Sequence, residues 1–277
     1  MASDLTPADA GISAPLAAPA PSPAPAREAR PPHWHRFVFV YGVLGGVLAI
    51  AIAGVVIYAG KAITPAPKWS SWHPSGGGLG AAKQIAANVG KEYRLPDGSQ
   101  LVDVIAKAPS VASGSTAGSG QVPIHFFVIH PSNGNDQVYP VSSSNSVMYS
   151  LCGLGTSCSI ATGKPSVARG TLVRREVLEL ALYTFKYVGG IKSVVAFMPP
   201  SSGTAQQYAV FLQKSDLQSE LKVPLVKTLR STTPLPAGIP AREVHEIDAT
   251  TESRVYTFGL SQSQTGDLVL VLHPLPA

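Results

Sequence analysis

A stretch of 24 residues without a charged side chain, 37–60 (FVFVYGVLGGVLAIAIAGVVIYAG), constrains this chain more than any other feature. A helix rises about 1.5 Å per residue, so about 20 of these residues span a hydrocarbon core of about 30 Å. A cleaved signal peptide is the rival interpretation, but its apolar region is typically only about 7–15 residues long. We therefore predict a retained transmembrane helix over 37–60.

Small residues recur along one face of this predicted helix, at Gly42, Gly46, Ala49 and Ala53. Small side chains let a second membrane helix approach closely. This face therefore predicts self-association or pairing with another membrane protein. The alternative is that Gly and Ala are simply frequent in membrane helices.

The segments on either side of the helix set its expected orientation. Residues 1–36 are rich in Ala and Pro and cannot bury much apolar surface, so we expect a disordered tail. Three arginines in this tail, against two lysines just after the helix, favour a cytoplasmic N-terminus. Residues 61–78 are predicted to be a linker, with Trp69 and Trp72 resting at the outer surface of the membrane. We thus predict a single-pass protein of the cell membrane with an extracytoplasmic C-terminal domain.

Residues 79–277 are predicted to form an α+β domain with a mixed, largely antiparallel sheet and packed helices. Apolar segments of strand length occur at 122–130, 192–200, 208–214, 254–262 and 268–274. The most regular helical pattern covers 166–188, where Ser166 can cap the start and Gly189–Gly190 can end the helix. We expect Arg175 and Glu179 on the polar face of this helix, and Glu176 among its surface charges.

Two segments of this domain echo each other. PSNGNDQVYPV (131–141) and PSSGTAQQYAV (200–210) share six of 11 residues, and each follows an apolar strand. One interpretation is an internal duplication with halves 79–165 and 166–277. The other is two ordinary hairpins drawn from a composition rich in Ser and Gly.

Motifs of known catalytic chemistry are absent from the sequence. It has neither a G-x-S-x-G nucleophile elbow nor an H-E-x-x-H metal motif. His125 and His130 are five apart in one predicted strand, so they face opposite sides and do not share a metal. His245, Glu246 and Asp248 form the only compact His/acid cluster, which we interpret as a solvated polar turn. We therefore predict no catalytic residue, no metal site and no cofactor.

A basic stretch is the candidate binding site. Between Asp136 and Glu176 there is no acidic residue, whereas the interval holds Lys164, Arg169, Arg174 and Arg175. Beside a predicted helix start, these cations favour an anionic envelope component such as lipid headgroups, wall polymers or an acidic protein surface. The alternative is scattered surface charge. Aromatic residues do not interleave with the cations, so we expect no nucleic acid.

Both cysteines of the chain, Cys152 and Cys158, lie in SLCGLGTSCSI (150–160). Their spacing matches neither a zinc site nor a C-x-x-C redox motif. Outside the cytoplasm a disulfide is expected. We expect Gly153 and Gly155 to supply the flexibility that such a tight ring needs.

These observations together predict a membrane-anchored, non-catalytic binding or assembly component of a cell envelope or secretion system. Two alternatives stay open. One is an envelope enzyme whose site is assembled from residues that are distant in the sequence. The other is a sensor that couples binding outside the cell to the cytoplasmic tail.

Overall fold

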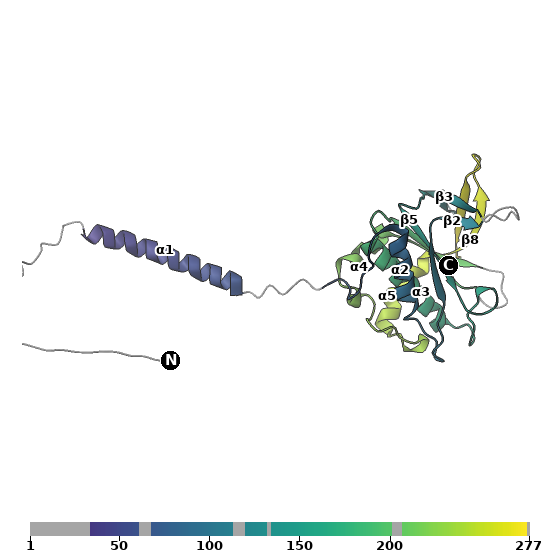
Figure 1. Cartoon of the computed structure of the whole chain (residues 1–277), viewed down its shortest axis with the longest axis horizontal. Helices are drawn as coiled ribbons and strands as arrows, with labels where there is room; N and C mark the ends of the chain where they lie inside the picture. The colour runs from purple at the N-terminus through teal and green to yellow at the C-terminus, as the bar shows by residue number, and fades with distance from the viewer. Residues whose placement is uncertain (1–33, 61–67, 113–119, 132–133, 201–206, 276–277) are drawn as a thin grey trace, which may run out of the picture. The chain divides into compact units, whose positions relative to one another are not determined.

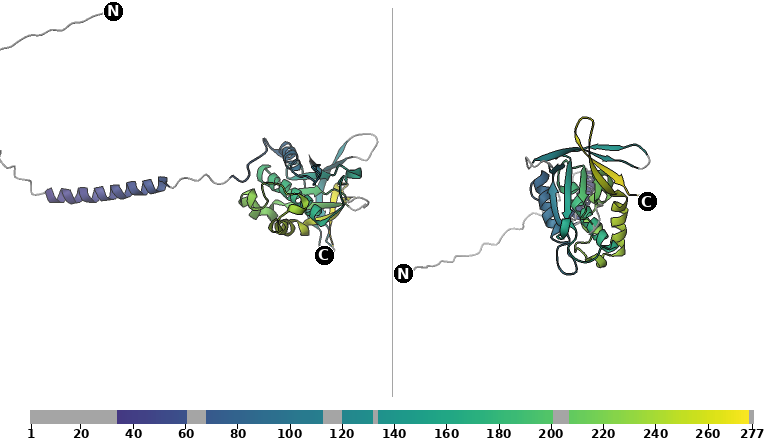
Figure 2. Two further views of the ribbon diagram at one scale, coloured as in Figure 1. Left: turned by 90° about the horizontal axis from the view of Figure 1, so that it is seen from below. Right: turned by 90° about the vertical axis from the view of Figure 1, so that its right-hand side faces the viewer.

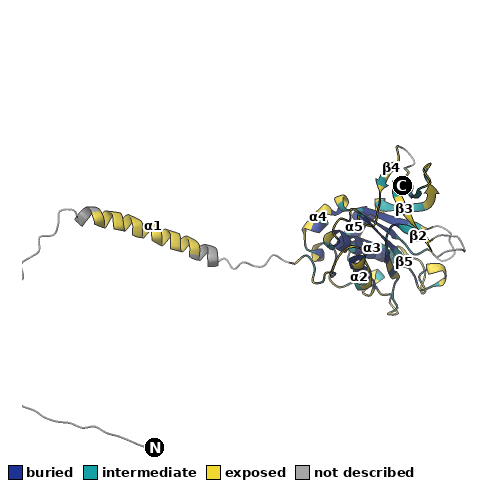
Figure 3. Ribbon diagram, turned by 45° about the horizontal axis from the view of Figure 1, so that its top comes forward, coloured by how far each residue is buried: buried dark blue, intermediate teal, exposed yellow. Residues whose placement is uncertain are grey.

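The computed structural model describes residues 34–60, 68–112, 120–131, 134–200 and 207–275, and it divides into two units, Met1–Pro65 and Ala66–Ala277. In the first unit the described element is one uninterrupted helix, α1 (Trp34–Gly60) (Figure 1). Its segment Phe37–Val55 is long and apolar enough to cross a membrane, and its side chains are exposed (Figure 3). Most of the predicted disordered tail, residues 1–33, lies outside the described residues.

The small-residue face lies on α1, at Gly42, Gly46, Ala49 and Ala53. A Cβ atom added at Gly42 or Gly46 would meet nothing within 4 Å in the described part of the chain. Packing of a second helix on this face therefore stays a prediction.

The second unit is built on one nine-stranded sheet. Its strands are β1 (Asp103–Lys107), β2 (Ser110–Ala112), β3 (Gln121–Ile129), β4 (Gln137–Pro140), β5 (Ser146–Cys152), β6 (Ser193–Phe197), β7 (Tyr208–Gln213), β8 (Val255–Gln262) and β9 (Leu268–Pro274). Their order is β1-β5-β6-β7-β8-β9-β3-β2, and β4 also pairs with β3. The β5–β6 and β3–β9 pairs are parallel and the other six are antiparallel. The predicted mixed, largely antiparallel sheet is thus confirmed.

The two ends of this strand order come from one stretch of chain. β1 ends at Lys107 and β2 begins at Ser110, yet β1 pairs with β5 whereas β2 pairs with β3. The chain therefore passes directly from one end of the sheet to the other, which leaves the sheet curled and nearly closed. The β8–β9 hairpin projects from this body (Figure 2), with Leu260 exposed near its tip.

Helices cover one face of the sheet (Figure 1). They are α2 (Gly78–Gly90), α3 (Val167–Tyr187), α4 (Gln218–Lys222) and α5 (Ala241–Thr251). Because side chains alternate along a strand, the central strands contribute to two cores. In β6, Val194 and Ala196 join the core beneath the helices, whereas Val195 joins a second core with Phe127 and Leu270.

The long predicted helix is confirmed as α3. The Ser166 hydroxyl accepts a hydrogen bond from the Arg169 backbone N–H at 3.3 Å, which is the predicted N-cap. At the other end the Val188 N–H bonds the Thr184 carbonyl, and Gly190 takes a positive φ of 84° that favours glycine. The predicted apolar stripe is buried, at Leu178, Ala181, Leu182, Phe185 and Val188.

Both echoing segments follow the first strand of an antiparallel hairpin, β3–β4 and β6–β7. Their turns include residues 132–133 and 201–206, which lie outside the described part. The proposed halves do not form separate sheets, because β6–β9 of the second half lie between β5 and β3 of the first. A duplication stays a prediction.

The segment after α1 departs from the predicted linker. Trp69 packs edge-on against Tyr183 and Tyr187 of α3, with centroid distances of 5.4 and 5.6 Å. Trp72 packs against Tyr183 in the same way. Both half-buried rings therefore pack on the folded unit, and their predicted place at a membrane surface stays a prediction. The folded unit thus includes residues 68–77, ahead of the predicted boundary at residue 79.

Candidate functional site

The four predicted anion-binding cations do not share one surface. Lys164 is exposed and Arg169 is half-buried at the start of α3. The Arg174 guanidinium donates to the Asp248 carboxylate at 2.7 Å. Arg175 is fully buried, so its expected place on a polar helix face was wrong. Of the four, Arg169 alone lines a described cleft.

This cleft, which we call the Arg169 cleft, has a volume of about 240 Å³. It lies between the start of α3 and the ends of β6 and β7, and its lining includes Ile160, Arg169, Met198, Pro200 and Tyr208. The cysteine loop and the second echoing segment both border this cleft. Ile160 is the last residue of 150–160, and Pro200 is the first residue of 200–210. Its lining is mostly apolar and contains one cation. It would therefore hold an anion less strongly than the predicted cluster of four cations.

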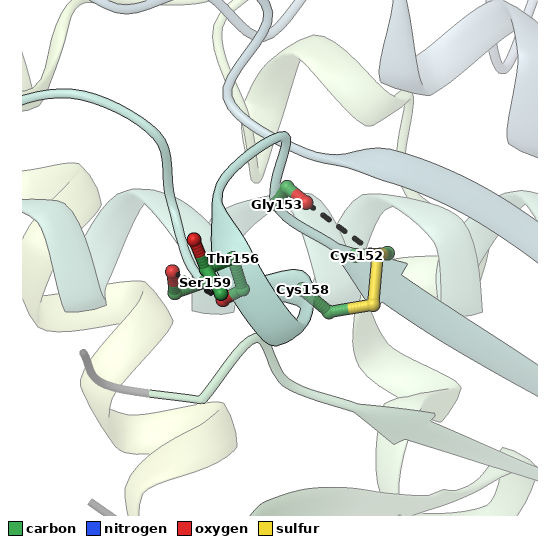
Figure 4. The surroundings of a disulfide bond; sticks show 5 residues. All are labelled: Cys152, Gly153, Thr156, Cys158 and Ser159. Carbon is green, nitrogen blue, oxygen red and sulfur yellow. Dashed lines mark hydrogen bonds between the residues drawn. A yellow bond between two sulfur atoms is a disulfide. The ribbon is translucent and has the colours of Figure 1, made fainter. Parts of the chain in front are cut away.

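The predicted disulfide joins Cys152, the last residue of β5, to Cys158 in the next turn (Figure 4). Two backbone hydrogen bonds close the loop, from the Gly153 N–H to the Cys158 carbonyl at 2.8 Å and from the Gly155 N–H to the Ser159 carbonyl at 2.7 Å. The positive φ angles fall on Ser157 and Cys158, at 55° and 63°, rather than on the glycines. Gly153 and Gly155 are needed for space instead, because a Cβ atom on either would overlap Ser159.

We expect Gly153→Ala to lower the free energy of unfolding by about 1–3 kcal/mol, the usual cost of overpacking. The new methyl group would overlap the Ser159 backbone, which cannot rotate away as a side chain could. Gly80→Ala is the control, because nothing lies within 4 Å of its added Cβ atom and Ala favours the helix. Urea denaturation of the full chain, followed by tryptophan fluorescence, measures both. Equal stability of the two variants would show that the close approach at Gly153 is unimportant.

The most unusual chemistry of the folded unit is a buried charged cluster around Arg175, which also contains Tyr93, Glu176, Glu179 and Glu243. The Arg175 guanidinium donates to Glu243 Oε1 at 2.7 Å, to the Tyr93 hydroxyl at 2.5 Å and to Glu179 Oε2 at 3.2 Å. A further bond at 2.9 Å reaches the Arg230 carbonyl. The Tyr93 hydroxyl in turn donates to Glu179 Oε2 at 2.6 Å. We call these five side chains the Arg175 cluster.

Glu176 is the exception within the Arg175 cluster. Its side chain is fully buried, and neither carboxyl oxygen has a hydrogen-bond partner among the described residues. Burial raises the pKa of Glu176 well above its usual range, and the neighbouring Glu179 charge raises it further. Burial also raises the pKa of Glu179, although the Arg175 guanidinium opposes that shift. Burial without a hydrogen-bond partner therefore favours the protonated, neutral form of Glu176.

Two clefts reach the Arg175 cluster. The first, the Trp69 cleft, has a volume of about 410 Å³ and is lined by Trp69, Glu179, Tyr183 and the loop after α4. The second has a volume of about 310 Å³ and includes Glu243 and Glu246 of α5 in its lining. Perturbed carboxyl groups beside clefts are a common property of functional sites, as well as of structural ion networks.

The predicted His/acid cluster is not a turn but lies on helix α5. His245 is exposed, and Asp248 is the partner of Arg174. His125 and His130 also have different hydrogen-bond partners. His125 bonds Asp267, and His130 bonds Asp136. Across the described ranges no three His, Cys, Asp or Glu side chains are placed to hold a metal ion.

Sequence reasoning missed the roles of Tyr93, Glu176 and Glu243. Arg175 and Glu179 look like an ordinary surface pair four residues apart, and nothing local distinguishes them. The available signal was weak. It consists of three charged residues, Arg175, Glu176 and Glu179, among the apolar residues of a largely buried helix.

Comparison with protein-family models, curated proteins and solved structures finds no match for this chain. The functional argument therefore depends on the geometry of the chain itself.

Proposed function

We propose that this protein is a single-pass membrane protein whose folded unit lies outside the cytoplasm and acts as a non-catalytic binding or assembly component of a cell envelope or secretion system. The observation that carries the proposal is a disulfide, Cys152–Cys158, in the unit that follows an apolar helix of membrane-spanning length. Cytosolic thiols are kept reduced, whereas disulfides persist in oxidising compartments. The helix supports anchoring, and the disulfide supports the side on which the unit lies.

Binding is favoured over catalysis by how the polar side chains are used. Arg175 directs its donors to internal partners in α3, in α5 and near α2. Asp248, which belongs to the compact His/acid cluster of the sequence, bonds Arg174. These groups connect elements of the fold to one another. Apart from Glu179, the linings of the Arg169 and Trp69 clefts consist of apolar, small polar and basic residues, which suits recognition of a ligand or partner.

An envelope enzyme is the second candidate, and one observation favours it. The Glu179 side chain is 18% exposed, lines the Trp69 cleft and has a raised pKa. A general acid needs a pKa closer to the working pH than an ordinary carboxyl group has. Turnover of an envelope substrate that Glu179→Gln abolishes would establish the enzyme in place of the binding protein. The sensor alternative depends on the tail, residues 1–33, which lies outside the described part.

The proposal predicts the state of the cysteines and the side of the membrane. Protein extracted from membranes and denatured without reductant should show no reactive thiol, and reduction should release two. In right-side-out vesicles a membrane-impermeant maleimide should label Ser215→Cys, an exposed site of the folded unit, but should label Ala10→Cys only after lysis. Two thiols without reduction, or the opposite labelling, would place the folded unit in the cytoplasm.

Crosslinking of the native protein in its membrane tests the assembly role. We expect a partner protein or envelope polymer to be recovered with it, or a homo-oligomer joined through the small-residue face of α1. Recovery of the monomer alone would contradict assembly while leaving the topology intact.

A further inference from the structure

The segment next to the membrane helix forms one wall of the Trp69 cleft. The Leu225 N–H donates to the Trp69 carbonyl at 2.7 Å, which joins this segment to the loop after α4. The Trp69 indole N–H donates to the Glu220 carbonyl at 3.4 Å, and Lys186 lies over the indole ring. The wall is therefore held to the folded unit by both backbone and side-chain contacts.

The segment 222–227, which contributes Leu225 and Val226 to the lining of the cleft, has an unusual surface. In its sequence KVPLVK (222–227), Val223 and Val226 are 39% and 59% exposed, and the flanking Lys222 and Lys227 are also exposed. Exposed apolar side chains between lysines are typical of protein segments that contact a membrane surface, where the apolar groups enter and the cations meet anionic headgroups.

The inside and the rim of the Trp69 cleft differ in character. The interior is largely apolar, with Leu225, Leu229, Tyr183 and Trp69 in its lining, and the lining also includes Glu179. Glu179 Oε2 accepts hydrogen bonds from the Arg175 guanidinium and the Tyr93 hydroxyl, so its charge is compensated within the Arg175 cluster. At the rim, Lys68 and Arg230 are exposed, and neither forms an ion pair with a described residue. The cleft thus combines an apolar interior with a basic entrance.

Chain length limits how far this cleft can be from a membrane that holds α1. Residues 61–67 separate Gly60, the end of α1, from Lys68 at the rim. A fully extended chain spans at most about 3.6 Å per residue, so the connection reaches at most about 29 Å. This step rests on the proposed membrane anchoring of α1.

We propose that the Trp69 cleft and the loop 222–227 bind an anionic phospholipid of the membrane in which α1 is anchored. The acyl region contacts Val223, Val226 and the apolar interior, and the headgroup phosphate lies between Lys68 and Arg230. The two walls already belong to one folded unit, so lipid binding requires no new fold. Its consequence is that the folded unit is held against the membrane surface rather than swinging freely on its connection.

The test uses the full chain in nanodiscs that contain a phosphatidylglycerol with a photoactivatable acyl chain, diluted into either phosphatidylglycerol or phosphatidylcholine. We expect crosslinks at two places, in residues 37–55 of α1 and in residues 222–231. Val226→Glu and Arg230→Glu should each lower the crosslinking yield at 222–231 about tenfold, because Val226→Glu opposes apolar insertion and Arg230→Glu repels the anionic headgroup. The yield in α1 should not change.

Val138→Glu is the matched control, because Val138 is 55% exposed on β4 and lies outside the cleft. It should leave both yields unchanged. Crosslinks confined to α1 would overturn this inference and leave the proposed anchoring intact. A crosslinking yield at 222–231 that is the same with Val226→Glu, or in either diluting lipid, would do the same. Loss of both sets of crosslinks, with release of the protein by alkaline carbonate, would overturn the proposed anchoring itself.

Discussion

Glu176→Met is expected to raise the free energy of unfolding by about 2 kcal/mol at pH 7, the typical cost of a buried polar group without a partner. The wild-type side chain is fully buried, and its two oxygens have no hydrogen-bond partner among the described residues. Methionine has a similar length and no polar oxygen to desolvate. For a domain of this size the midpoint of thermal unfolding should rise by about 4–8 °C.

The gain should depend on pH in a defined direction. In the unfolded chain Glu176 titrates near pH 4.3, whereas burial and the neighbouring Glu179 raise its pKa in the folded state. Between these two pKa values the folded state binds the additional proton, so its stability falls as pH rises. The advantage of Glu176→Met should therefore be smallest below about pH 4.3 and grow as the pH is raised. Arg175, Glu179 and Tyr93, which face Glu176, are the same in both proteins.

Urea denaturation of the full chain in detergent, followed by the fluorescence of Trp69 and Trp72, measures the effect. Glu92→Met is the matched control, because the Glu92 side chain is 60% exposed, and its effect should stay within about 0.5 kcal/mol. A Glu176→Met variant less stable than wild type, or a gain that shrinks with rising pH, would mean that the carboxyl group has a partner in the folded protein.

Much of the fold follows from local sequence patterns. The strands β6, β7 and β9 are short apolar runs bounded by turns or polar residues, and α3 combines a Ser cap, a periodic stripe and a terminal Gly pair. Such features act over a few residues, so a single sequence reveals them. The disulfide was predictable for a similar reason, because the chain has only two cysteines and the predicted extracytoplasmic placement favours their pairing.

The candidate site depends on contacts that no local pattern contains. Arg175 is buried because its guanidinium bonds Tyr93, which lies 82 residues earlier in the chain, and Glu243, which lies 68 residues later. Trp69 is half-buried because α3 supplies Tyr183 and Tyr187 more than 100 residues later. Arg175 was assigned to a polar helix face because arginine is usually exposed, and Trp69 to a linker because residues 61–78 are rich in Pro, Ser and Gly.

In contrast to Glu176→Met, Arg175→Met is expected to destabilise the protein. The expected loss is about 3–5 kcal/mol in the free energy of unfolding at pH 7. The substitution preserves much of the volume but leaves Glu179 and Glu243 buried near each other without their cation. It also removes the bonds to Tyr93 and to the Arg230 carbonyl. The next residue offers a control in the same helix. Arg174→Met breaks a more exposed pair with Asp248 and should cost about 1 kcal/mol or less.

The Arg175→Met deficit should also widen as the pH rises above about 4.3, where an unfolded glutamate titrates. Without the guanidinium the pKa of Glu179 in the folded state rises further, because Arg175 is what opposes the effect of burial. Folding then takes up protons across this range, and stability falls with pH. Arg175→Met/Glu243→Met should recover part of the loss, since removing both charges leaves no unpaired ion at that contact. If Arg175→Met cost no more than Arg174→Met at every pH, the cluster would not be what joins α3 to α5 and to Tyr93. The carboxyl groups would then be free for the chemistry that the enzyme alternative requires.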